Sequence, residues 1–251
     1  MKIVFLGVGE AFDENYPNNA HLIISDQTTI LLDCGDSAVR QLWKYTSDHN
    51  LIDCLFITHR HSDHLFGIPA LLGRMLEEKR TKDLTIICSE KIKEDIERIS
   101  EHAYQGLKSN FGFNINFIIA EEEKSIQFNE LTLSFALSNH TSHNLAVKIN
   151  NGKNIVCYSG DGIINEQSWD LYQDANLLIH EAYTYDKEIR GHVKIKDLIT
   201  AAEKYNVKCL ALTHFKRDFI KNELEKYLPV ILKNDNLQII IPKPMDEYEI
   251  N

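Results

Sequence analysis

The chain has 251 residues, of which 43% are hydrophobic and 25% are charged, a composition typical of a globular protein. Its formal net charge of -10 disfavours long-range attraction of a polyanion such as RNA. No apolar run reaches the length of a membrane span, and the N-terminal residues resemble a first strand more than a signal sequence. Five scattered cysteines, mostly in apolar runs, suggest reduced thiols, so we expect a cytoplasmic protein with no membrane partner.

In the first half of the chain, short alternating or fully apolar runs predict strands, and longer runs with a 3.6-residue period predict helices. The expected strands of this half are 2–6, 20–25, 28–33, 53–58 and 84–88. The expected helices are 36–47, 67–78 and 90–103.

The second half opens with strands and then alternates between helices and strands. The expected strands are 113–120, 131–138, 145–150, 154–158, 177–180, 208–213 and 237–241. The expected helices are 166–173, 195–205 and 217–226. This order of strands and helices fits two sheets packed face to face with helices on their outer faces. It therefore predicts an α/β fold of the four-layer αββα sandwich type. We expect residues 1–251 to form a single domain.

The most informative segment is Thr58-His59-Arg60-His61-Ser62-Asp63-His64, which follows the apolar run 55–57. Neutral imidazoles and carboxylates are the side chains that hold zinc, iron or manganese. Crowding them into one loop is unfavourable unless a cation lies among them. The segment therefore predicts a metal site at the end of a strand.

Further candidate ligands stand at the ends of other expected strands. His140 follows 131–137, Asp161 follows 155–160, and His214 follows 209–213. His180-Glu181 closes the run that begins at residue 177. Because strand ends on one side of a sheet converge in space, we expect these residues to meet the first cluster.

These motifs resemble the metallo-β-lactamase superfamily. Within it, the chain is similar to the ribonuclease Z branch, the tRNA 3′-processing endonucleases. The resemblance rests on the His-x-His-x-Asp-His motif, on single later ligands, and on the branch motifs Gly7-x-Gly9, His180-Glu181-Ala182, Gly191-His192 and Leu212-Thr213-His214-Phe215.

The resemblance implies two divalent metal ions, most simply Zn²⁺, with Mn²⁺ or Fe as alternatives. One ion would be held by His59, His61 and His140, and the other by Asp63, His64 and His214, with Asp161 bridging them. Two cations about 3.5–4 Å apart can share and activate one water and clamp the oxygens of a phosphodiester. The implied enzyme is a metal-dependent hydrolase that acts through a metal-bridging hydroxide, and the branch also implies a homodimer.

Three residues are candidates for proton transfer. Glu181 would orient the imidazole of His192 and favour its protonated form, so that His192 protonates the leaving alkoxide. Asp63 would accept a proton from the bridging water. Asp33, in Asp33-Cys34-Gly35, is expected to support the metal loop without being a ligand.

The chain departs from the ribonuclease Z pattern in one large feature. That family carries a Gly/Pro-rich arm that grips tRNA between the lone histidine and the bridging aspartate. Here only two strands and the turn 150–153 separate His140 from Asp161, so the arm is lacking. The substrate therefore stays open between RNA and a smaller phosphodiester, such as a cyclic nucleotide or a short oligonucleotide.

Two other functions remain as alternatives. An acyl hydrolase of the same fold would act on a thioester, a lactone or a β-lactam, and it would not need the Glu181/His192 pair. A metal-dependent binding or regulatory protein could keep the same ligands for stability.

Overall fold

The computed structural model, which describes residues 1–250, contains two seven-stranded mixed sheets. The first sheet has the order β14-β1-β2-β3-β4-β5-β6. Its strands are β1 (Lys2–Gly7), β2 (Ala20–Ile24), β3 (Thr29–Leu32), β4 (Cys54–Phe56), β5 (Leu84–Cys88), β6 (Ile115–Ile119) and β14 (Glu247–Glu249). β3 to β6 run parallel to one another, whereas β14, β1, β2 and β3 are joined by antiparallel pairings.

The second sheet repeats this plan, with the order β13-β12-β11-β10-β9-β8-β7. Its strands are β7 (Ser125–Phe128), β8 (Leu131–Ser138), β9 (Asn144–Asn150), β10 (Ile155–Tyr158), β11 (Leu177–Glu181), β12 (Cys209–Thr213) and β13 (Gln238–Ile240). β10 to β13 are parallel, and the pairings from β7 to β10 are antiparallel.

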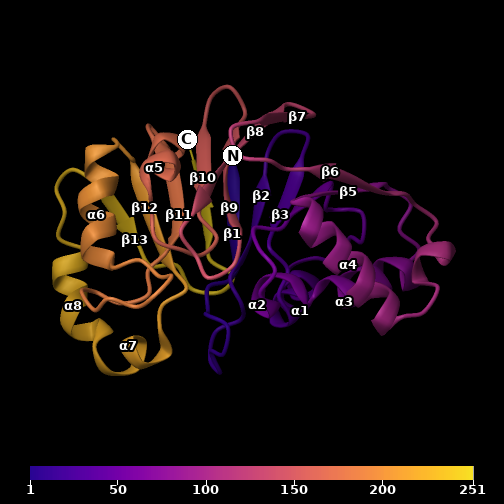
Figure 1. The fold of residues 1–251 in the computed structure, drawn as a ribbon, viewed down its shortest axis with the longest axis horizontal. Helices are drawn as coiled ribbons and strands as arrows, with labels where there is room; N and C mark the ends of the chain where they lie inside the picture. The colour runs from indigo at the N-terminus through magenta and orange to yellow at the C-terminus, as the bar shows by residue number, and fades with distance from the viewer. Residues whose placement is uncertain (251) are drawn as a thin grey trace.

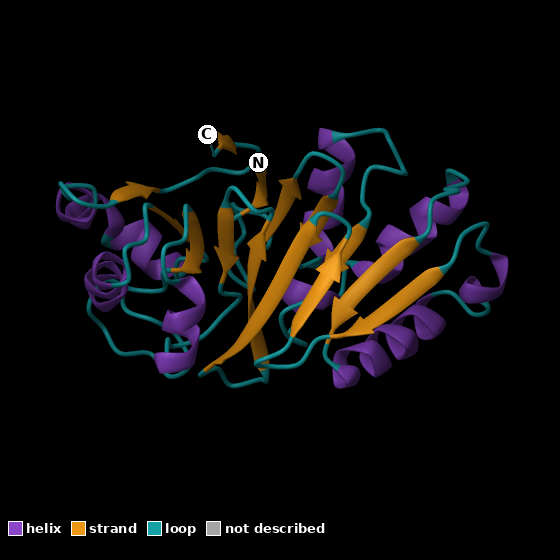
Figure 2. Cartoon of the chain, turned by 90° about the horizontal axis from the view of Figure 1, so that it is seen from above, coloured by secondary structure: helices purple, strands orange, loops and turns teal. Residues whose placement is uncertain are grey.

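Helices cover the outer face of each sheet, as Figures 1 and 2 show. Those beside the first sheet are α1 (Asp36–Tyr45), α2 (Ser62–Leu65), α3 (Ile68–Glu77), α4 (Glu90–Ala103) and the 3-10 turn η1 (Leu107–Asn110). Those beside the second are α5 (Glu166–Tyr172), α6 (Ile195–Lys204), α7 (Arg217–Asn222) and α8 (Leu224–Ile231). No helix of residues 1–250 is both long enough and apolar enough to cross a membrane.

Alternation along the strands divides the buried side chains into layers. In β1, Ile3 and Phe5 belong to the core shared by the two sheets, whereas Val4 and Leu6 belong to the core under the helices of the first sheet. A third core joins the second sheet to its own helices. Three apolar layers between four layers of secondary structure confirm the predicted αββα sandwich.

The structure differs from the sequence prediction in several short elements. The expected helix 217–226 is two helices, α7 and α8, which meet at Glu223. The one-turn helix α2 lies inside the expected metal loop. Strands β7 and β14 were not expected at all, although β14 closes the first sheet by pairing with β1.

Candidate metal centre

The predicted ligands lie at the ends of strands that share one edge of the sandwich. β10, β11 and β12 run parallel, so the residues that follow or close them emerge together. The seven predicted ligands are His59 and His61 after β4, Asp63 and His64 on α2, His140 after β8, Asp161 after β10 and His214 after β12. All seven are brought together in two groups that share Asp161.

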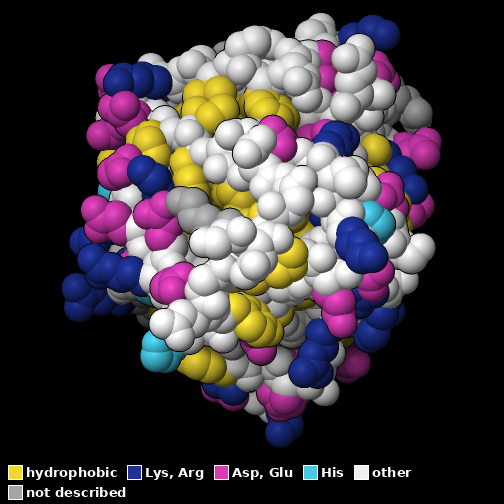
Figure 3. All heavy atoms as spheres, turned by 90° about the vertical axis from the view of Figure 1, so that its right-hand side faces the viewer, with side chains coloured by type: hydrophobic (Ala, Val, Ile, Leu, Met, Phe, Trp, Pro, Cys, Tyr) yellow, Lys and Arg dark blue, Asp and Glu magenta, His cyan; other side chains and the backbone are white. Residues whose placement is uncertain are grey.

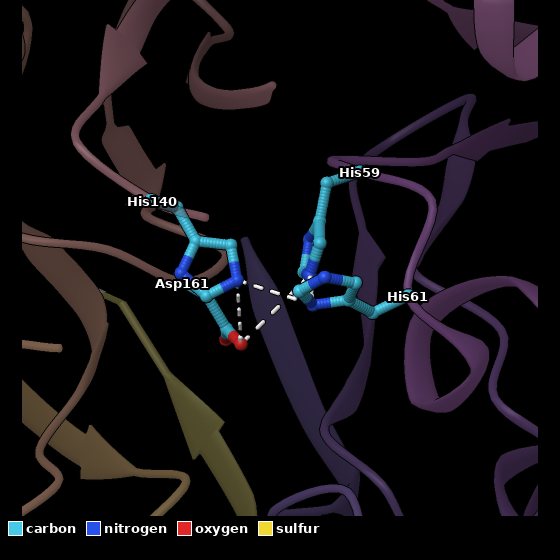
Figure 4. A group of neighbouring side chains, drawn as sticks. All are labelled: His59, His61, His140 and Asp161. Carbon is cyan, nitrogen blue, oxygen red and sulfur yellow. Dashed lines mark hydrogen bonds and ion pairs between the residues drawn. The ribbon is translucent and has the colours of Figure 1, made fainter. Parts of the chain in front are cut away.

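The first group consists of His59, His61, His140 and Asp161. Nδ1 of His61 lies 3.1 Å from Nε2 of His59 and 3.1 Å from Nε2 of His140. Oδ2 of Asp161 lies 3.8 Å from Nε2 of His59 and 3.9 Å from Nε2 of His140. Figure 4 shows the rings and the carboxylate pointing toward one another from opposite halves of the chain.

The second group consists of Asp63, His64, Asp161 and His214, and all four residues are buried. Nε2 of His64 lies 3.1 Å from Oδ2 of Asp63 and 3.5 Å from Oδ1 of Asp161. Nε2 of His214 lies 3.4 Å from Oδ2 of Asp63 and 3.5 Å from Oδ2 of Asp161. Each oxygen of Asp161 thus faces this group, and Oδ2 also faces the first.

Hydrogen bonds from outside the groups fix which imidazole nitrogens point inward. Nδ1 of His64 donates to Oδ2 of Asp33 at 2.7 Å, and Nδ1 of His140 donates to the carbonyl of Gly191 at 2.8 Å. The hydroxyl of Thr58 donates to Asp33 and accepts from Nδ1 of His59 at 2.9 Å. In these tautomers the Nε2 atoms carry lone pairs that face the centre.

The donor set fits divalent cations. In the first group, Nε2 of His59 and Nε2 of His140 both lie 3.1 Å from Nδ1 of His61. In the second, Nε2 of His64 and Oδ1 of Asp161 are buried and have no hydrogen-bond partner. Such atoms are unfavourable unless a positive charge lies among them. His and Asp donors suit zinc, manganese or iron.

The electrostatics of the second group also favour positive charge. Burial opposes protonation of His64, yet Asp63 and Asp161 raise its pKa well above the usual value. Burial likewise opposes protonation of His214, but Asp161 and Asp63 raise its pKa to about 9. In the absence of other cations the carboxylates draw protons onto these two histidines. A metal ion would satisfy the same carboxylates.

A third group, Glu181, His192 and His214, borders the second. Nδ1 of His192 lies 2.9 Å from Oε2 of Glu181, and Oε1 of Glu181 accepts the N–H of Gly162 at 2.6 Å. Burial and Asp161 raise the pKa of Glu181 well above the usual value, while burial lowers the pKa of His192 to about 4.

Backbone conformation at the strand ends is specialised. Asp33 and His214 have φ angles of 57° and 55°, in the left-handed region that few side chains adopt. Gly160, before Asp161, has a φ of 60°, and a Cβ there would lie 2.4 Å from Oδ1 of Asn144. These sharp turns direct Asp161 and His214 from the strand ends toward the other His and Asp side chains of the two groups.

Residues 1–234 match the model of the family described as Anti-Pycsar protein Apyc1. The chain belongs to this family. The chain is also 28% identical to ribonuclease Z of Methanocaldococcus jannaschii, in an alignment that covers 100% of this chain and 97% of that protein. Human tRNase Z, short form, superposes with a TM-score of 0.80 at 22% identity, with 100% of each chain covered.

A second solved structure has the same fold as this chain. The metallo-β-lactamase fold protein YhfI from Bacillus subtilis superposes with a TM-score of 0.78 at 21% identity, covering 98% of each chain. The predicted membership of the metallo-β-lactamase fold, with similarity to the ribonuclease Z branch, is therefore confirmed. The sequence similarity to ribonuclease Z and the His/Asp cluster support the prediction of a metal-dependent hydrolase of the ribonuclease Z type.

Some residues of the site were not anticipated from the sequence. The hydroxyl of Thr58 and the carbonyl of Gly191 orient ligand histidines, and Tyr183 stacks on His192 with ring centroids 3.9 Å apart. Thr58 and Gly191 each stand directly before a predicted site residue in the sequence, His59 and His192, and this adjacency could have pointed to them. His180, considered as a ligand, directs Nδ1 to the carbonyl of Glu181 instead.

Proposed function

We propose that this protein is a two-metal phosphodiesterase whose substrate is a small nucleotide phosphodiester or a short RNA. One observation carries the proposal. Seven buried or half-buried His and Asp donors converge in two groups around Asp161, and a hydrogen-bonded Glu181–His192 pair lies beside them. Metal ligands alone suit many hydrolases, but a proton donor is needed chiefly when the leaving group is a poor one, such as an alkoxide.

In this proposal the first group would hold one divalent ion and the second would hold another, with Asp161 as a residue of both groups. Zn²⁺ is the first choice, with Mn²⁺ or Fe as alternatives, because His and Asp ligation suits all three. When bound, such a pair would supply Lewis acidity toward the phosphate oxygens and lower the pKa of a water molecule. Asp63, which faces both His64 and His214, is the proposed acceptor for that water's proton.

The Glu181–His192 pair would deliver a proton to the leaving oxygen. Oε2 of Glu181 and Nδ1 of His192 lie 2.9 Å apart, close enough to share one proton. With that proton on Glu181, Nε2 of His192 carries its own and can donate it. As Nε2 releases its proton, Nδ1 takes the one held by Glu181, so one proton in total reaches the leaving group.

The short connection between β9 and β10 favours a small substrate. β9 and β10 are joined by a tight turn in which the side chain of Asn151 accepts the N–H groups of Lys153 and Asn154 at 3.1 Å and 2.8 Å. The alignment with ribonuclease Z of M. jannaschii spans 316 residues, whereas this chain has 251, so that relative carries residues that have no counterpart here. Basic and acidic side chains are interspersed over the face around α4 (Figure 3), which does not favour a long RNA there.

Three further parts of the proposal come from the resemblance and the composition: a single domain over residues 1–251, a homodimer, and a cytoplasmic location. The absence of a membrane-spanning helix among residues 1–250 is compatible with the last of these.

A substrate panel on protein reconstituted with defined Zn²⁺, Mn²⁺ or Fe²⁺ tests the proposal. The panel contains 2′,3′- and 3′,5′-cyclic nucleotides, a dinucleotide, precursor tRNA, a thioester and a lactone. We expect hydrolysis of the small phosphodiesters, loss of activity in His140→Ala, and unchanged activity in the matched control His102→Ala, whose side chain is exposed on α4. Turnover confined to the thioester or lactone would replace the phosphodiesterase by an acyl hydrolase.

A further inference from the structure

Tyr183 lies two residues beyond the end of β11 and covers one face of His192. The two ring centroids are 3.9 Å apart and the ring planes differ by 12°, so the rings are stacked almost in parallel. This is a shorter separation than between His192 and either neighbouring histidine, His140 at 5.4 Å or His214 at 6.0 Å. Of these three rings, the tyrosine therefore makes the closest contact with the imidazole face.

The backbone around Tyr183 is fixed from both sides. Its carbonyl accepts the N–H of Lys216 at 3.0 Å, two residues beyond His214. The carbonyl of Thr184, the next residue, accepts the N–H of Ile195 at 2.9 Å. Tyr183 is thus held in place by three elements: the strand that ends in Glu181, the turn that carries His214 and the start of α6.

The edge and the face of His192 are restrained by different residues. Glu181 holds the Nδ1 edge through a hydrogen bond of 2.9 Å, and a single hydrogen bond leaves the ring free to swing about that contact. Stacking opposes this swing because a parallel arrangement at 3.9 Å is lost when the imidazole tilts. Together the two contacts define the plane of the ring and the direction of Nε2.

We propose that Tyr183 is a positioning residue for His192: its ring holds the imidazole plane so that Nε2 is directed at the leaving oxygen. This inference rests on the proposed function, since it assigns His192 the role of proton donor. The aromatic ring carries the effect, and the phenol hydroxyl is not required. Donors must be held to within about 0.5 Å and 10–20° for efficient transfer, so a loss of stacking should lower the rate without removing the donor.

The test compares Tyr183→Leu with Tyr183→Phe in metal-loaded protein. Two substrates are used, a dinucleotide with an alkoxide leaving group and bis(p-nitrophenyl) phosphate, whose leaving group needs little protonation. We expect Tyr183→Leu to lower kcat on the dinucleotide about tenfold and to change kcat on the activated ester less than about twofold. Tyr183→Phe should behave as the native protein, and metal content should be the same in all variants.

A double variant separates positioning from a general structural effect. If Tyr183 acts through His192, then adding Tyr183→Leu to His192→Ala should cause no further loss on the dinucleotide. Equal loss on both substrates, or a full further loss in the double variant, would overturn the inference. Should Tyr183→Leu fail to fold by circular dichroism, Tyr183→Met takes its place under the same criteria.

The same measurements distinguish this inference from the function on which it rests. If His192→Ala shows no preference for the activated ester, the proposed proton donor is wrong and the role of Tyr183 is wrong with it. If His192→Ala shows that preference and both Tyr183→Leu and Tyr183→Met match the native protein, the donor stands and the inference about Tyr183 alone is overturned.

Discussion

Asp33 accepts three hydrogen bonds through one carboxylate oxygen, and the shortest of them link it to His64 and Tyr158. Oδ2 of Asp33 lies 2.7 Å from Nδ1 of His64, 2.7 Å from the hydroxyl of Tyr158 and 2.9 Å from the hydroxyl of Thr58. Thr58 in turn accepts from His59. A single buried carboxylate thus orients one histidine of each of the two His/Asp groups, although it belongs to neither.

Removal of this carboxylate should weaken both groups. We expect Asp33→Ala to lower metal affinity about 10- to 100-fold, as is usual for residues that orient ligand histidines. Competition with a chelator of known affinity, followed by elemental analysis, measures the change. The matched control is Asp26→Ala, whose side chain is exposed. Unchanged affinity in Asp33→Ala would show that the histidines hold their orientation without it.

Asp161 faces both groups, with Oδ2 3.8 Å from Nε2 of His59 and 3.5 Å from Nε2 of His214. We therefore expect Asp161→Ala to reduce the binding of both proposed ions together. Isothermal titration with metal, on protein first freed of metal, gives the stoichiometry, and Asp170→Ala on the exposed side of α5 serves as the control. Loss of one ion with the other retained at native affinity contradicts a bridging role.

Much of the site was predictable because the ligand types and their places after apolar runs are local features of the sequence. The motif at 59–64 and single residues such as His140 and His214 follow strands that the pattern identifies. What the pattern does not contain is contact between distant residues. The stacking of Tyr183 on His192 and the bond from Tyr158 to Asp33 depend on how the strands end in space.

The missed elements have a similar explanation. β14 is only three residues long and exists because β1 offers it an antiparallel partner, which no local pattern reveals. β7, with the sequence Ser-Ile-Gln-Phe, lies next to the charged run 121–124 and depends on pairing with β8. α2 forms a single turn, too short for a helical period to show. Local propensity did not decide any of these three.

His192 gives a test of the proton donor that does not depend on Tyr183. We expect His192→Ala to keep its metals but to lose about 100-fold or more in turnover of a dinucleotide, because the leaving alkoxide is no longer protonated. The loss on bis(p-nitrophenyl) phosphate should be much smaller. The control His143→Ala changes an exposed histidine outside the three groups. Equal losses on the two substrates would exclude His192 as the donor.

His21 gives a test of stability at acidic pH. Both of its ring nitrogens are buried without a hydrogen-bond partner, and its ring contacts Phe5 and Tyr158 edge-on. Burial, helped by the charge of His64, lowers the pKa of His21 from 6.5 to about 3. Between these values the unfolded chain binds a proton that the folded protein does not, so stability present above pH 6.5 is lost as the pH falls toward 3.

We expect His21→Leu to reduce this acid sensitivity. Between pH 7 and pH 5 the native protein should lose about 2 kcal/mol of unfolding free energy more than the variant, the difference that one histidine with so low a folded pKa contributes. Urea unfolding at each pH measures it, and comparison within one pH removes the contribution of the clustered His and Asp residues because both proteins contain them. Parallel curves for the two proteins would mean that His21 takes up its proton in the folded state, and that the surrounding rings accommodate the charge.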